Sequence, residues 1–297
     1  MSLLRPVLLA LAAWLAGSSL AAQTVLTDPT LQLKTWTVAG VPREAAVYVP
    51  PSAATAPRPL VFVFHGANNS MNSIIKFFAF HGEWPEAVIV YMQGLVSPLA
   101  AGRVEKRANG STKSGTGWQL LPGATADRDL AFFDAALATL RHEHAIDPAR
   151  IYATGHSAGA GFTSLLWQTR GDTLAAVALV AGGLLAAAPD RAAAMSPGTP
   201  FTATDPATLL RPKPALIVAG RQDQTVPFVW MERMVALAKQ VNGCTAASVP
   251  WGTDLCAWYP AQTGSTPVVT YFHPGGHGVP KDAVGLIVKF FHEHASR

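Results

Sequence analysis

The chain has 297 residues, of which 22 are basic, 18 are acidic and two are cysteine. The formal charge of +4 is spread along the chain, and the single basic cluster, Arg103–Arg107, is too small for a nucleic-acid-binding surface. Two thiols supply too few ligands for a zinc site. The composition therefore argues against a nucleic-acid partner, and we expect neither a metal nor a cofactor.

The N-terminus has the layout of a secretory signal peptide. Arg5 precedes an apolar core, Val7–Leu15, and small residues follow this core up to Ala21. The core is shorter than the ~20 residues that a membrane span needs, which argues against an anchor. We expect residues 1–22 to be removed on export. Residues 23–297 would then form one secreted domain, extracellular or periplasmic, with no stable membrane insertion.

Alternating or apolar runs predict eight strands along the rest of the chain. The first two, 33–38 and 45–49, alternate and are joined by a short turn, so we expect them to pair antiparallel. Amphipathic helices are predicted between the later strands, with clear core-facing stripes at 129–142 and 283–292. The expected fold class is α/β, with one doubly wound and mostly parallel sheet that starts with an antiparallel strand pair. The predicted parallel strands are 60–64, 87–91, 151–154, 175–180, 215–218 and 268–272.

The segment Gly155–Gly159 follows the predicted strand at 151–154 and precedes a stretch compatible with a helix. A G-x-S-x-G pattern at a strand-to-helix junction is typical of a nucleophile elbow, a strained turn that exposes a serine. A side chain on either glycine would collide with the neighbouring strand and helix. Ser157 is therefore the predicted nucleophile. The alternative is a chance pentapeptide in a chain rich in glycine and alanine.

An elbow serine is followed in the chain by an acid and then by a histidine, each placed just after a later strand. Asp223 follows the strand at 215–218 and is the predicted acid. The glycine-rich loop after the strand at 268–272 contains His277, the predicted base. His273 lies at the end of that strand and is the competing candidate, which we interpret as a structural residue. The acid and the base would complete a catalytic triad with the serine.

Acyl transfer also requires backbone N–H groups that point at the carbonyl oxygen, where negative charge develops. One donor is the residue after the nucleophile, Ala158, and the other lies on the loop that follows the strand at 60–64. Ala67 belongs to that loop and is the predicted second donor of the oxyanion hole. His65, in the same loop, is interpreted as a residue that braces it rather than as a second base.

Several short segments strengthen this interpretation because they occur together and in a consistent order: Val63–Gly66, Tyr91–Gly94, Gly117–Trp118, Asp127–Phe132, Ile146–Arg150 and Asp223–Pro227. With them, the mature chain resembles the α/β-hydrolases of the secreted polyhydroxybutyrate depolymerase and feruloyl or acetylxylan esterase group, relatives of carbohydrate esterase family 1. The group usually has a tryptophan where this chain has Val279. That departure leaves the histidine in place and affects only the substrate expected.

The resemblance implies a single α/β-hydrolase domain that hydrolyses carboxylic esters through an acyl-enzyme intermediate. The implied substrates are polyhydroxybutyrate-type polyesters, or feruloyl and acetyl esters of polysaccharides. A serine peptidase of the prolyl-oligopeptidase type shares the triad order, although no propeller-sized region precedes the domain here. A non-catalytic binding protein on this fold would typically lack a triad residue, and all three are present. A cofactor-free perhydrolase or haloperoxidase also stays open.

Two further predictions concern the surroundings of the site. Trp118 is a candidate for the wall of the substrate cleft, although a solitary tryptophan is as often a packing residue. Cys244 and Cys256 are the only cysteines, and in an oxidising compartment we expect them to form a disulfide. That bond would staple the segment between the acid and the base.

Overall fold

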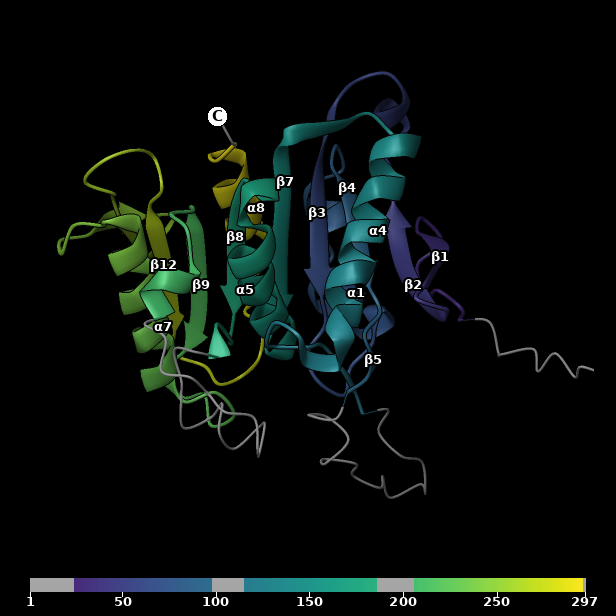
Figure 1. Ribbon diagram of the computed structural model, residues 1–297. Coiled ribbons are helices and arrows are strands. Elements are labelled where there is room, and N and C mark those ends of the chain that lie inside the picture. Colours follow the sequence, from purple (N-terminus) through teal and green to yellow (C-terminus); the bar gives the residue numbers. More distant parts are fainter. Residues whose placement is uncertain (1–23, 98–114, 186–205, 296–297) are drawn as a thin grey trace, which may run out of the picture.

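The computed structural model describes residues 24–97, 115–185 and 206–295. The predicted signal peptide, residues 1–22, and the basic cluster Arg103–Arg107 lie outside these residues. In the described part of the chain, one large sheet runs through the molecule and helices cover both of its faces (Figure 1). Two short strands, β5 (Leu95–Val96) and β6 (Thr116–Gly117), form a separate antiparallel ribbon.

The large sheet has ten strands in the order β1-β2-β4-β3-β7-β8-β9-β12-β11-β10. Neighbours from β4 through β12 are parallel, whereas the strands at both edges pair antiparallel. The predicted mostly parallel sheet with an antiparallel N-terminal pair is thus confirmed. The strands are β1 Gln32–Val38, β2 Val41–Tyr48, β3 Arg58–Phe64, β4 Val88–Met92, β7 Ile146–His156, β8 Ala176–Val180, β9 Ala215–Gly220, β10 Val249–Trp251, β11 Thr253–Tyr259 and β12 Val268–His273.

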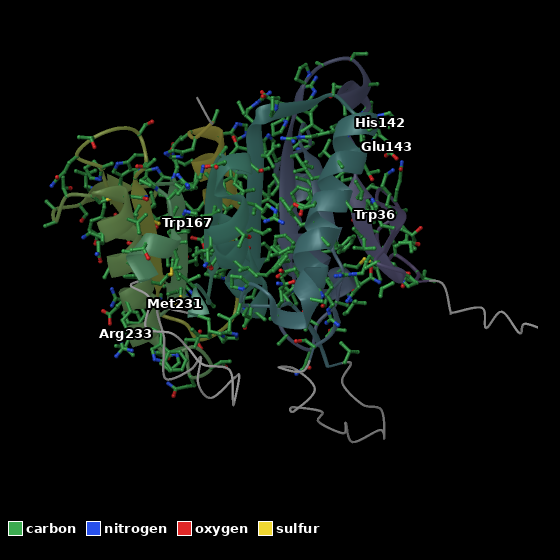
Figure 2. The ribbon with its side chains drawn as sticks, in the orientation of Figure 1. Trp36, His142, Glu143, Trp167, Met231 and Arg233 are labelled. Carbon is green, nitrogen blue, oxygen red and sulfur yellow. The ribbon has the colours of Figure 1, made fainter. Side chains whose placement is uncertain are left out.

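Each face of the sheet has its own apolar core, because successive side chains of a strand point to opposite faces. Phe62 of β3 packs with α4, α5 and α7 on one face, where Trp167 and Met231 are labelled in Figure 2. Val61 of the same strand packs with α1, α2 and α8 on the other face. The helices are α1 Met71–Phe77, α2 Phe80–Glu83, α4 Arg128–Glu143, α5 Ala158–Arg170, α7 Phe228–Asn242 and α8 Ala283–His292, with 3₁₀ turns η1 Pro51–Ala54, η2 Ala124–Asp127, η3 Gly171–Thr173 and η5 Pro206–Leu209.

The carboxyl ends of the parallel strands meet along one edge of the sheet. Strand β3 ends at Phe64, β7 at His156, β9 at Gly220 and β12 at His273. The segments that follow these strands contain, in order, the predicted oxyanion loop, the nucleophile, the acid and the base. The topology therefore brings residues that are far apart in the sequence together at one edge of the sheet. This carboxyl edge is where α/β sheets bind their ligands.

The hairpin of β10 and β11 was not predicted: three of the seven residues of β11 are exposed and only Cys256 is buried, so this strand lacks the fully buried pattern of the parallel strands. This hairpin also changes the expectation for the cysteines. Cys256 belongs to the core on the α8 face of the sheet, whereas Cys244 packs against the core on the α7 face. Both thiols are free in the structure. The predicted disulfide is therefore wrong, since the two side chains pack on opposite faces of the sheet.

Candidate active site

The turn between β7 and α5 has the geometry of a nucleophile elbow. Ser157 has φ 55° and ψ −116°, a conformation that L-residues rarely adopt. A Cβ on Gly155 would lie 2.5 Å from the carbonyl carbon of Gly159, and a Cβ on Gly159 would lie 2.1 Å from the carbonyl oxygen of Phe64. These distances are shorter than real Cβ contacts, so both positions require glycine, as the sequence pattern predicts.

Strand β8 holds the elbow in place. The Ser157 N–H donates to the carbonyl of Val180 at 2.8 Å, and a Cβ on Gly182 would lie 2.3 Å from the Ser157 carbonyl oxygen. Gly182 is thus a third glycine that the elbow requires. Although Ser157 is the N-cap of α5, its hydroxyl caps no backbone N–H of that helix. Its Oγ is therefore not committed to a capping bond.

The predicted acid and base are in direct contact. His277 Nδ1 lies 2.7 Å from Asp223 Oδ2, and the Asp223 side chain is only 2% exposed. The other oxygen, Oδ1, accepts hydrogen bonds from the N–H groups of Thr225 (2.7 Å) and Val226 (2.8 Å). Because the carboxylate is held on both oxygens, it fixes the imidazole with a proton on Nδ1. The opposite nitrogen, Nε2, then has a free lone pair.

Backbone contacts join the acid loop to the histidine loop. The Gln222 N–H donates to the carbonyl of Gly275 at 3.0 Å, and a Cβ on Gly220 would lie 2.2 Å from the carbonyl oxygen of Gly276. Such close approach of two backbones is possible only where a glycine lacks a side chain. The relative positions of the acid and the base are therefore set by main chain as well as by their own hydrogen bond.

The competing histidine, His273, is held within its own loop. Its Nδ1 accepts a hydrogen bond from the Gly275 N–H at 3.2 Å, and the residue is buried beside Tyr271. Burial lowers the pKa of His273. In the described part of the chain it makes no hydrogen bond to Asp223. The structure thus places His277, and not His273, on the acid.

Ser157 and His277 share no hydrogen bond among the described residues. The residue before the serine links the two elements instead. His156 Nε2 lies 2.7 Å from the carbonyl oxygen of His277, and the two rings pack with centroids 4.8 Å apart. The sequence interpretation missed His156, because the second position of a G-x-S-x-G pattern carries no residue requirement. Only its adjacency to the serine could have drawn attention to it.

The predicted oxyanion loop packs against the elbow. A Cβ on Gly66 would lie 3.4 Å from the Cβ of Ser157. The exposed Ala67 follows, and the Asn68 N–H donates to the carbonyl of Thr116 at 2.8 Å. The N–H groups of Ala67 and Ala158 have no acceptor among the described residues. The structure therefore leaves both predicted donors available beside the nucleophile.

His65 braces this loop from beneath. Its Nδ1 lies 2.7 Å from the Gly66 carbonyl, and its Nε2 accepts from the Gly94 N–H at 2.9 Å. The first contact requires a proton on Nδ1 and the second requires none on Nε2, so the ring is neutral. Burial accordingly lowers the pKa of His65 to about 4. A neutral, fully buried ring held on both nitrogens is a bracing residue, as the sequence interpretation expects.

Trp118 is a core residue in the structure and not part of a cleft wall. It is 1% exposed, and its ring is stacked on Phe162 with centroids 5.2 Å apart. Its Nε1 donates to the carbonyl of His65 at 2.8 Å. The predicted substrate contact is therefore not found, because the indole is packed beneath the oxyanion loop that it supports.

The described residues also bear on metal binding and on membrane crossing. Over residues 24–97, 115–185 and 206–295, no group of three or more His, Cys, Asp or Glu residues is arranged to bind a metal ion. No helix within those same ranges is long and apolar enough to cross a membrane.

Comparison with known proteins adds to this geometry. No protein-family model matches the chain. Over 161 residues it is 32% identical to poly(3-hydroxyalkanoate) depolymerase C of Paucimonas lemoignei, a match that spans 48% of this chain and 38% of that protein. The chain thus aligns with well under two thirds of this relative.

Solved structures match over much more of the chain. An acetyl xylan esterase from Aspergillus awamori superposes with a TM-score of 0.61 at 16% identity, covering 88% of this chain and 99% of the esterase. A ferulic acid esterase from Anaeromyces mucronatus superposes with a TM-score of 0.56 at 15% identity, covering 92% and 93% of the two chains. The chain has the α/β-hydrolase fold.

In the α/β-hydrolase fold, the nucleophile, the acid and the histidine follow one another in the chain in that order. Here Ser157 follows β7, Asp223 follows β9 and His277 follows β12. The two predicted backbone donors, Ala158 and Ala67, are the first residue of α5 and a residue of the loop after β3. The arrangement presents a serine hydroxyl, an oriented imidazole and an electrophilic pair of N–H groups, which together are the groups that acyl transfer needs.

Proposed function

We propose that this protein is a serine carboxylic-ester hydrolase with a triad of Ser157, His277 and Asp223. The observation that carries the proposal is the 2.7 Å contact between Asp223 and His277 at the sheet edge where the strained Ser157 lies. Esters are the proposed substrates because a partial relative is named a depolymerase of a polyester and two fold neighbours are named esterases.

In the first half-reaction, Ser157 Oγ attacks the ester carbonyl carbon as His277 Nε2 accepts the hydroxyl proton. The carbonyl oxygen becomes an oxyanion that accepts hydrogen bonds from the N–H groups of Ala67 and Ala158. Asp223 stays ionised and stabilises the imidazolium. The intermediate then collapses, the carbon–oxygen bond to the alcohol breaks, and the alkoxide takes the proton back from His277.

The second half-reaction releases the acyl group. Water gives a proton to His277 Nε2 and attacks the carbonyl carbon of acyl-Ser157. Collapse of the second tetrahedral intermediate breaks the bond to Oγ, which recovers the proton. The products are one carboxylic acid and one alcohol, and no metal or redox cofactor takes part in any step.

The proposed ester is either a polyhydroxybutyrate-type polyester or a feruloyl or acetyl ester of a polysaccharide. Polyhydroxybutyrate film, methyl ferulate, acetylated xylan and p-nitrophenyl esters from acetate to octanoate separate these possibilities. A preference for film is the result expected of a depolymerase. A preference for methyl ferulate or acetylated xylan would instead assign the protein to polysaccharide esters.

Two controls test the reaction class. Ser157→Ala should abolish hydrolysis of every ester in this set while leaving the protein folded, because the substitution removes one oxygen. Peptide p-nitroanilides should not be cleaved. Cleavage of p-nitroanilides faster than of esters, or ester hydrolysis that survives Ser157→Ala, would overturn the proposal.

We further propose that the protein is secreted and that residues 1–22 are removed. The support is the order of a basic residue, a short apolar core and small residues in that segment. N-terminal sequencing of the protein recovered outside the cytoplasm tests this directly. An intact Met1 in that material would contradict the proposal.

A further inference from the structure

The loop that carries His277 contains glycine at positions 275, 276 and 278. Glycine adopts many backbone conformations, so such a loop does not by itself fix the position of its histidine. The ring of His277 is held by Asp223. Its main chain has one hydrogen bond among the described residues, from His156 Nε2 to the carbonyl oxygen at 2.7 Å. The carbonyl contact is therefore, with the Asp223 hydrogen bond, one of the two hydrogen bonds that His277 itself makes among the described residues.

His156 is itself firmly placed. It is the last residue of β7 and pairs with Val180 of β8, and it precedes Ser157 directly. Its other ring nitrogen, Nδ1, faces the oxyanion loop, since a Cβ on Gly66 would lie 3.1 Å from it. The residue thus contacts the segments that carry the nucleophile, the oxyanion donors and the base.

The chemistry of the His156 ring suits this position. A carbonyl can only accept, so Nε2 of His156 carries the proton in the 2.7 Å contact. Loss of solvent around the ring lowers the pKa of His156 to about 4. The ring is therefore neutral when His277, 4.8 Å away, becomes an imidazolium during the reaction. A cation at this distance would oppose that charge, whereas a neutral donor does not.

We propose that His156 is a positioning residue that fixes His277 relative to Ser157 through the carbonyl oxygen of the base. The inference rests on the proposed function, because it assigns His156 to the reaction of the same triad. His156 does not touch the reacting atoms. It acts by holding the imidazole where Nε2 can reach the serine hydroxyl.

The decisive variant is His156→Phe, which keeps an aromatic ring and removes the donor. We expect kcat for p-nitrophenyl esters to fall by about 10- to 100-fold with KM changed less than about threefold, because a small displacement of a catalytic group costs turnover more than binding. His156→Gln carries an N–H close to the place of Nε2 and should recover much of kcat. The matched control is His294→Phe, because His294 is also buried and its Nδ1 lies 2.7 Å from the carbonyl of Phe290, away from the triad.

A spectroscopic readout separates positioning from a general loss of stability. In protein labelled with ¹⁵N-histidine, the His277 Nδ1–H proton held by Asp223 should give a downfield resonance. His156→Phe should broaden or remove this resonance, and His294→Phe should leave both the resonance and kcat unchanged. A wild-type kcat and an unchanged resonance in His156→Phe would overturn the proposal.

Two cases remain: the His156→Phe variant fails to fold, or the wild-type protein hydrolyses no ester. If His156→Phe does not fold, His156→Gln and His156→Asn replace it, because only the longer amide reaches the His277 carbonyl. Equal kcat values for these two variants would overturn the proposal. If the wild-type protein hydrolyses no ester, the proposed function fails, and the resonance of the resting protein still decides whether His156 holds His277.

Discussion

Asp223→Asn is the substitution whose effect follows most directly from the hydrogen bonds of the site. Asp223 Oδ1 accepts from the N–H groups of Thr225 (2.7 Å) and Val226 (2.8 Å). In the asparagine variant the amide oxygen must occupy this position, because an NH₂ group there would face two other donors. The NH₂ group then faces His277 Nδ1, which lies 2.7 Å from the second carboxylate oxygen in the native protein.

A ring nitrogen that faces an NH₂ donor can only accept, so the proton of His277 moves from Nδ1 to Nε2. The imidazole then presents an N–H to Ser157 and has no lone pair for the hydroxyl proton. This tautomer error costs about 10⁴ in kcat for a serine hydrolase, equivalent to about 5.5 kcal/mol of activation free energy. The fold should be unaffected, because the side chain keeps its shape and both backbone hydrogen bonds.

The assay is kcat for p-nitrophenyl acetate at neutral pH, with the melting temperature measured on the same samples. Asp282→Asn is the matched control, since Asp282 accepts a hydrogen bond from the Tyr271 hydroxyl at 2.7 Å and has no place in the proposed mechanism. We expect the control to keep wild-type turnover. Asp223→Asn with more than a tenth of wild-type kcat would refute the assignment of the acid.

Three other predictions concern the fold and the conditions under which it is stable. Gly159→Ala should destabilise the protein by about 3 kcal/mol or more in urea unfolding, because its Cβ would lie 2.1 Å from the Phe64 carbonyl oxygen; a wild-type midpoint would contradict the elbow geometry. Burial lowers the pKa of His65 from 6.5 to about 4. Between these pH values the unfolded chain protonates His65 and the folded protein does not, so the free energy of unfolding should decrease as the pH falls from 6.5 towards 4. His65→Gln should make that decrease shallower, and an unchanged slope would argue against a buried neutral ring. Dithiothreitol should not change the melting temperature, because Cys244 and Cys256 are free thiols; an unreduced, denatured sample that takes up fewer than two alkyl groups would show a disulfide instead.

The sequence predicts most of the sheet because its parallel strands are buried on both faces and form continuous apolar runs. It predicts the elbow because Gly155 and Gly159 are required by close backbone approach and not by a side-chain preference. The acid and base are found by their place after strands, and the structure brings Asp223 and His277 into contact. The same reasoning does not find β11, because only Cys256 of its seven residues is buried and both of its neighbours, β10 and β12, pair with it antiparallel.

The predictions from the sequence fail where the outcome depends on the direction in which a side chain points. Cys244 and Cys256 are close in sequence, but only the pairing of β11 with β12 reveals that they pack on opposite faces of the sheet. Trp118 follows a glycine in a stretch without periodicity, so nothing in the sequence shows that it is buried beneath the oxyanion loop. His156 was missed because its partner is a backbone carbonyl 121 positions away in the chain.

The central claim is that Ser157 is the nucleophile, and covalent labelling tests it most directly. The purified protein is treated with a fluorophosphonate, and the labelled peptide is located by mass spectrometry while residual ester hydrolysis is followed on the same sample. We predict one adduct per chain, on Ser157, with activity lost in proportion to labelling and no adduct in Ser157→Ala. Full ester hydrolysis with Ser157 unlabelled, or an adduct on another residue that abolishes activity, would contradict the account.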